Sequence, residues 1–110
     1  MGPGGDDDDN DLEREGGSDV AEETRVEKPR RFKVIFHNDD YTTMEFVISV
    51  LMKFFHKSEA EAHHIMLTVH TKGAATAGIY PRDVAESKVA TTMAHARELG
   101  MPLTLSTEPE

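Results

Sequence analysis

Residues 38–46 read NDDYTTMEF, and they separate a segment of alternating polarity from a segment with helical periodicity. Asn38, Asp39 and Asp40 are turn formers. Thr42 followed by Glu45 fits a capping box, in which two backbone N–H groups at a helix start are satisfied by side chains. The stretch therefore predicts a turn between a strand that ends at residue 37 and a helix that Thr42 caps.

The segments on either side of this turn support that interpretation. Upstream, residues 31–37 alternate and predict a strand whose core face carries Phe32, Val34 and Phe36. Downstream, apolar residues recur at helical spacing at Met44, Val47, Ile48, Leu51 and Phe55. A second capping box, Ser58 with Glu61, predicts another helix with the apolar side Ala62, Ile65, Met66 and Val69.

The remaining elements complete a small fold. Gly73 ends the second helix, and residues 74–80 predict a strand in which Gly78 permits close backbone approach. A third helix is expected over residues 82–99, its buried face being Val84, Ala85, Val89, Met93 and Ala96, and a short strand over 103–107. The order β-α-α-β-α-β predicts a single small α+β domain with a three-stranded antiparallel sheet packed against three helices.

Charge divides the chain into two parts. Residues 1–30 carry 11 acidic and 4 basic residues and no aromatic residue, whereas all seven aromatic residues lie in residues 31–110. A segment with few apolar residues and many charges buries too little apolar surface to compensate for the conformational entropy that it would lose on folding. We therefore expect residues 1–30 to be a disordered acidic N-terminal extension and residues 31–110 to be the folded domain.

The composition disfavours several classes of protein. The chain has no cysteine, which excludes disulfides and thiolate chemistry, and no apolar run of membrane-spanning length. Its acidic N-terminus argues against a secretory or organellar signal. The net charge of −9 argues against nucleic-acid binding, which needs clustered Lys and Arg. A soluble cytoplasmic protein is expected.

The sequence offers no support for catalysis. His63 and His70 share a face of the second predicted helix but lie two turns apart, about 10 Å by helix rise, which is too far for one metal ion. Asp39 and Asp40 are neighbours, and neighbours in an extended turn usually point apart. There is no nucleophile motif and no Gly-rich phosphate loop. We expect no enzyme activity, no metal site and no cofactor.

A binding site explains the same residues better than catalysis does. A free amine is largely protonated at neutral pH, and the carboxylate and amide oxygens of the 38–40 turn can accept its hydrogens, as can the imidazole of His70. Met44, Val47, Met66 and Val69 are candidate walls of an adjoining apolar pocket, for which adaptable methionine side chains are suited. Two interpretations stay open from the residues alone: this pocket, or an ordinary turn and cap beside a helical core.

Several motifs in order resemble the ClpS family, the adaptors of the bacterial Clp protease. The turn NDDYT, followed by MEFV at 44–47, is similar to the family signature. The segments 51–55 (LMKFF), 65–70 (IMLTVH), 73–80, 84–90 (VAESKVA) and 102–103 also resemble the family at matching spacing. The resemblance covers residues 31–108. Thr43 stands where the family usually has proline, which is expected to loosen the helix start slightly. Pro81 replaces the Thr that caps the third helix in many members, so Asp83 is expected to supply that cap. Asp83 itself replaces the more usual Glu.

The resemblance implies a function and a set of residues. ClpS proteins are not enzymes: they bind proteins whose N-terminal residue is Phe, Leu, Tyr or Trp and deliver them to the ClpAP protease. By resemblance, Asn38, Asp39 and His70 hold the α-amino group and first peptide bond, while Asp40 and Thr42 support that rim. The side-chain pocket is formed by Met44, a gate against β-branched residues, with Val47, Met66, Val69 and Leu103.

The resemblance also implies partners. Asp83, Glu86 and Lys88 are expected on the face that docks the N-terminal domain of the unfoldase ClpA, and the acidic extension is expected to engage the unfoldase during hand-over. We expect a monomer that binds N-degron peptides and proteins. The alternative is a non-catalytic interaction domain that resembles the C-terminal domain of the ribosomal stalk protein. A third hypothesis, a zinc hydrolase that uses the histidines, would require bound metal in the purified protein.

Overall fold

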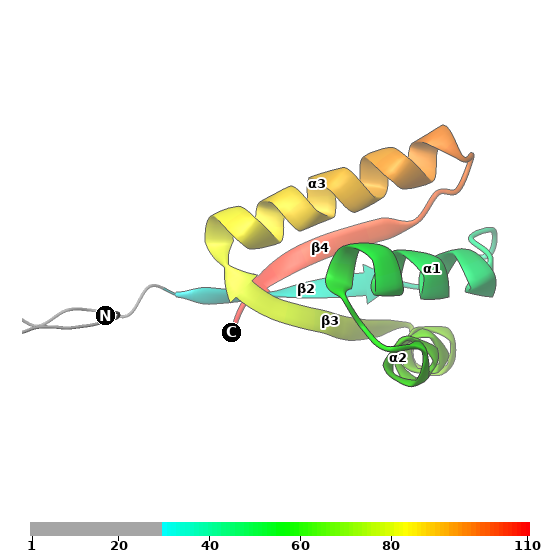
Figure 1. Cartoon of the computed structure of the whole chain (residues 1–110), viewed down its shortest axis with the longest axis horizontal. Coiled ribbons are helices and arrows are strands. Elements are labelled where there is room, and N and C mark those ends of the chain that lie inside the picture. The colour runs from blue at the N-terminus through cyan, green and yellow to red at the C-terminus, as the bar shows by residue number, and fades with distance from the viewer. Residues whose placement is uncertain (1–29) are drawn as a thin grey trace, which may run out of the picture.

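The computed structural model describes residues 30–110, which form one α+β unit (Figure 1). The predicted acidic extension, apart from Arg30, lies outside the described residues. The predicted order β-α-α-β-α-β is confirmed, with elements β2 (Arg31–His37), α1 (Met44–Phe55), α2 (Glu59–Lys72), β3 (Ala74–Pro81), α3 (Arg82–Glu98) and β4 (Thr104–Pro109). The observed bounds of the three strands and of α3 differ from the predicted ranges by at most two residues.

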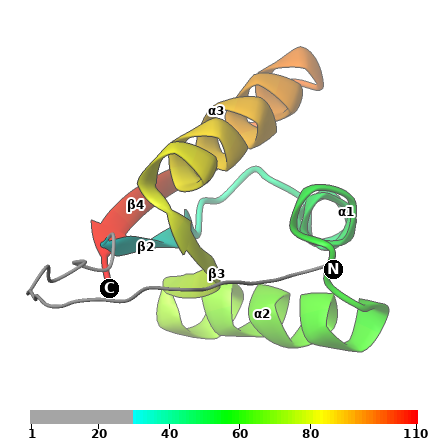
Figure 2. The ribbon, with the colours of Figure 1, turned by 60° about the vertical axis from the view of Figure 1, so that its left-hand side comes forward.

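The sheet is antiparallel and has the order β3-β2-β4, so β2 is its central strand. Val34 and Phe36 are fully buried on the face predicted to meet the core. The Phe36 ring makes an edge contact with Phe55 of α1, with centroids 5.3 Å apart, and α3 contacts all three strands. Helix α2 packs instead against α1 and β3, and Figure 2 shows it on the opposite side of the fold from α3.

The helix starts confirm one predicted cap and correct another. The Ser58–Glu61 capping box of α2 is present, with both reciprocal hydrogen bonds. The predicted Thr42–Glu45 box at α1 is wrong: Thr43 is the N-cap, and its side chain accepts a hydrogen bond from the N–H of Phe46. Thr42 is not the cap because its hydroxyl donates to the Asp39 carboxylate.

Three further expectations about packing change in the structure. Helix α3 follows Pro81 without any side-chain cap, so Asp83 does not take the capping role expected of it. Val84 is 38% exposed, whereas the buried residues of α3 are Ala85, Thr92 and Ala96. At Gly78 the close neighbour is a side chain rather than backbone, because a Cβ there would lie 2.6 Å from Cζ of the Tyr80 ring.

Candidate functional site

The site begins where β2 ends. The backbone N–H of Asn38 donates to the carbonyl of Gly73 at 2.9 Å, which ties the strand end to the C-terminal end of α2. His37 is paired with Ala74 in the same sheet register. The last turn of α2, with Val69 and His70, is thereby placed beside the turn that follows β2.

Asp39 organises that turn. One carboxylate oxygen accepts the backbone N–H groups of Tyr41 and Thr42 at 2.8 and 2.6 Å, and the other accepts the Thr42 hydroxyl at 2.7 Å. Burial acts to raise the pKa of Asp39, but the hydrogen bonds from Thr42 and Tyr41, together with the charge of Arg97, hold this pKa below its usual value. Asp39 is therefore ionised at neutral pH and committed to the turn.

Asp40 differs from its neighbour. Its side chain is exposed, and within residues 30–110 its carboxylate accepts no hydrogen bond and forms no ion pair. The bonds that support the turn, which were expected of Asp40, are thus made by Asp39. The expected contact of Asp39 with the amine of a ligand stays a prediction. The two adjacent carboxylates differ in their hydrogen bonds because their side chains leave the turn in different directions.

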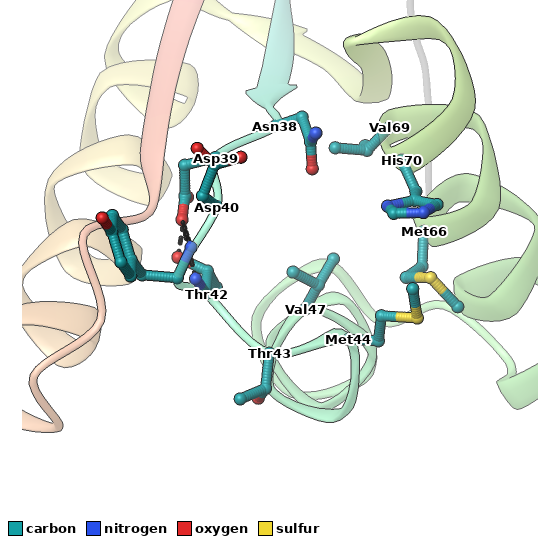
Figure 3. Close-up of a pocket in the computed structure, with 11 residues that line it drawn as sticks. Asn38, Asp39, Asp40, Thr42, Thr43, Met44, Val47, Met66, Val69 and His70 are labelled. Atoms are coloured by element: carbon teal, nitrogen blue, oxygen red, sulfur yellow. Dashed lines mark hydrogen bonds between the residues drawn. The ribbon is translucent and has the colours of Figure 1, made fainter.

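A cavity of about 390 Å³ opens beside this turn. Figure 3 shows Asn38 at the end of β2 facing Val69 and His70 of α2. The thioether ends of Met44 and Met66 lie close together below His70, across from Asp39 and Thr42. The lining brings together nine predicted site residues: Asn38, Asp39, Asp40, Thr42, Met44, Val47, Met66, Val69 and His70. The hollow combines a polar rim from the turn with apolar walls from two helices.

The lining differs from the prediction at three positions. Leu103 does not line the cavity; it is 1% exposed in the core, where Arg97 donates to its carbonyl at 3.0 Å. Tyr41 and Thr43 line the cavity although the sequence did not single them out for it. Tyr41 is 79% exposed, and its position inside the polar turn was the available signal.

The chemistry of the lining suits binding rather than reaction. Within the part of the chain that the structure describes, no group of three or more His, Cys, Asp or Glu side chains is placed to hold a metal ion. The rim offers hydrogen-bond acceptors from Asn38 and Asp40 and an imidazole from His70. A cationic group at the rim, attached to an apolar group that packs against Met44, Val47, Met66 and Val69, matches both halves of the cavity.

The residues expected to dock an unfoldase lie on the N-terminal half of α3. Asp83 and Glu86 are exposed, and Glu86 pairs with Arg82 at 3.6 Å. Lys88 is turned inward: its ammonium group donates to the Phe54 carbonyl at the end of α1 at 2.7 Å. It also lies 5.5 Å from the Phe55 ring centroid and 5.3 Å from that of Tyr80.

The family described as "ATP-dependent Clp protease adaptor protein ClpS" matches residues 27–106, which include the whole site. The chain belongs to the ClpS family. Members of this family are adaptors and not catalysts, so the chain is not an enzyme. The family match also decides against the stalk-protein alternative and the zinc hydrolase.

Relatives of this ClpS-family chain share about half of its residues. The ATP-dependent Clp protease adapter protein ClpS of Deinococcus radiodurans is 52% identical over 96 residues, covering 87% of this chain and 85% of the relative. The protein of the same name from Lawsonia intracellularis is 49% identical over 94 residues, covering 86% of each chain. Both alignments span most of each protein, so the likeness is not confined to one motif.

A solved structure is similar throughout its length. Agrobacterium tumefaciens ClpS2 bound to L-phenylalaninamide matches with a TM-score of 0.73 and 41% identity, over 76% of this chain and 100% of that one. The ClpS fold is therefore confirmed. Among residues 30–110, no helix has the length and apolarity that a membrane crossing requires.

Proposed function

We propose that this chain is a Clp protease adaptor that binds proteins beginning with a bulky hydrophobic residue, Phe, Leu, Tyr or Trp, and delivers them to ClpAP. The observation that carries the proposal is the cavity beside the 38–43 turn, which joins an acidic rim to apolar walls. The ligand of the similar A. tumefaciens ClpS2, L-phenylalaninamide, has one part to match each half of such a cavity: a free α-amine for the acidic rim and a benzyl side chain for the apolar walls.

Each part of the site takes a separate role in this proposal. The α-amino group is held by Asn38, Asp40 and His70, whose polar atoms stand at the rim, while Asp39 and Thr42 fix the turn that presents them. The Asp40 carboxylate, which has no partner among residues 30–110, is the natural acceptor for a protonated amine. Apolar side chains line the pocket for the first residue: Met44, Val47, Met66 and Val69. Met44 is the gate against β-branched residues.

Delivery uses other surfaces. We propose that α3 docks the N-terminal domain of ClpA through Asp83 and Glu86, both of which are exposed. Residues 1–30 are proposed as the extension that the unfoldase engages, joined directly to the central strand β2. The adaptor is proposed to act as a cytoplasmic monomer.

Two peptides that differ only in the first residue test the proposed function. Peptides beginning with Phe and with Ser, each labelled at the C-terminus, are titrated with the protein and followed by fluorescence anisotropy. The Phe peptide is expected to bind about tenfold tighter or more, because burying a Phe side chain contributes about 1.5–3 kcal/mol. Equal affinity for the two peptides would contradict the proposal.

A second prediction separates docking from folding on α3. Lys88→Met is expected to lower the free energy of unfolding by about 1–2 kcal/mol, because a charged hydrogen bond and two aromatic contacts are lost. Glu86→Gln is expected to leave stability within about 0.5 kcal/mol, since the ion pair of Glu86 with Arg82 is exposed, and to weaken binding of the ClpA N-terminal domain. Urea unfolding and a binding titration measure the two effects. Unchanged stability of Lys88→Met would show that its internal contacts contribute little.

A further inference from the structure

Thr43 determines where helix α1 begins. Its backbone is extended, with φ −74° and ψ 152°, and its hydroxyl oxygen accepts the N–H of Phe46 at 3.1 Å. Its carbonyl accepts the N–H of Val47 at 3.2 Å. The first N–H groups of a helix have no partner within the helix, so a side chain that satisfies one of them holds the first turn closed.

The first residue of that helix is Met44, which stands at the mouth of the cavity. Its side chain is 43% exposed, and in Figure 3 its thioether end approaches that of Met66 on α2. The preceding turn is held separately, since the bonds of Asp39 reach Tyr41 and Thr42 and no further. The cap made by Thr43 is therefore the side-chain hydrogen bond that holds the first turn of α1, where Met44 lies.

A side chain at the mouth discriminates between ligands by their shape near the backbone. Val and Ile carry two heavy atoms on Cβ, whereas Phe and Leu carry one and broaden only further out. A Met44 held in place leaves room for the second kind of side chain and obstructs the first. If the first turn of α1 opens, Met44 withdraws and this obstruction is lost.

We propose that Thr43 is a positioning residue for specificity: its cap on α1 holds Met44 where it excludes β-branched first residues. This inference rests on the proposed function, because it concerns the same pocket. It assigns to Thr43 a role in choosing the ligand, although Thr43 need not touch the ligand.

The test compares Thr43→Ala with Thr43→Ser, using peptides that begin with Phe and with Val. The ratio of the two affinities is the quantity measured. Thr43→Ala is expected to lower the preference for Phe over Val about fivefold, the population change that corresponds to a typical N-cap loss. Thr43→Ser keeps the capping oxygen and is expected to stay within about twofold of the wild-type ratio. Amide exchange at Phe46 is expected to be faster in Thr43→Ala alone.

Ser58→Ala is the matched control. Ser58 caps α2 in the same manner, accepting the N–H of Glu61 at 3.2 Å, and it does not line the cavity. Its loss is expected to lower stability without changing the ratio. An unchanged ratio in Thr43→Ala, or an equal change in Ser58→Ala, overturns the positioning role and leaves the proposed function intact. Failure of the wild-type protein to bind the Phe peptide overturns both.

Discussion

Acetylation of the N-terminal amine is expected to abolish binding of a Phe peptide, with a loss of affinity of about a hundredfold or more. The α-amino group has a pKa near 8 and is mostly charged at neutral pH. In the proposed site this charge faces Asp40, whose carboxylate has no other partner within the described residues. Removing one partner of a hydrogen-bonded charge pair that the bound ligand buries costs about 2–5 kcal/mol.

The acetyl group also adds bulk at the narrow end of the ligand. Asn38 and His70 line the same rim, so an added carbonyl and methyl group would displace the amine from all three acceptors. The two contributions are separated by a desamino peptide, which lacks the charge without the added bulk. It is expected to bind more weakly than the free amine and no more weakly than the acetylated peptide.

Isothermal titration of the three peptides measures these differences, and Asp40→Asn provides the matched protein variant. In Asp40→Asn, the difference in affinity between the free and the acetylated peptide is expected to be smaller than in the wild type. Comparable affinity of the free and acetylated peptides for the wild-type protein would refute the amine site. If Asp40→Asn leaves this difference in affinity unchanged, the amine contacts rim residues other than Asp40.

Local patterns predict the elements of this fold well where one pattern has no competitor. The strand over residues 31–37 was predicted with its observed bounds because its alternation ends in three turn formers. The cap of α2 was predicted because Ser58 and Glu61 satisfy each other's backbone donors without help from the rest of the chain. Similarly, Met66 and Val69 reach the cavity from positions that helical spacing already placed on one face.

Predictions failed where two neighbours offered the same chemistry. Thr42 and Thr43 are both able to cap a helix, and the hydrogen bond from Thr42 to Asp39 decides between them. Asp39 and Asp40 are both able to support the turn, and the path of the turn decides that Asp39 accepts the backbone N–H groups. The role predicted for Leu103 in the side-chain pocket stays a prediction, since Leu103 is 1% exposed and is not part of the cavity lining.

Replacement of Asp39 by Ala is expected to damage both the fold and the site. The carboxylate accepts three hydrogen bonds from Tyr41 and Thr42, two of them backbone N–H groups. Hydrogen bonds to a charged acceptor contribute more than neutral ones, so the free energy of unfolding is expected to fall by about 1–3 kcal/mol. The freed turn also carries Asn38 and Asp40, so affinity for the Phe peptide is expected to fall at least about tenfold.

The pH dependence of stability identifies the ionised carboxylate as the cause. The pKa of Asp39 is lower in the folded protein than the ordinary value of 3.8, so its contribution to stability is present above pH 3.8 and is lost as the pH falls through the folded-state pKa. The stability difference between the wild type and Asp39→Asn is therefore expected to be constant near neutral pH and to shrink below pH 3.8.

Urea unfolding at several pH values measures this difference, and Glu45→Gln is the control, because it removes an exposed acidic group from the same segment without breaking the turn. The free energy of unfolding of Glu45→Gln is expected to differ little from that of the wild type at every pH. A stability difference for Asp39→Asn that shows no decrease at any pH below 3.8 would show that the shape of the side chain, rather than its charge, holds the turn. Binding that survives Asp39→Ala would show that the rim keeps its geometry without these bonds.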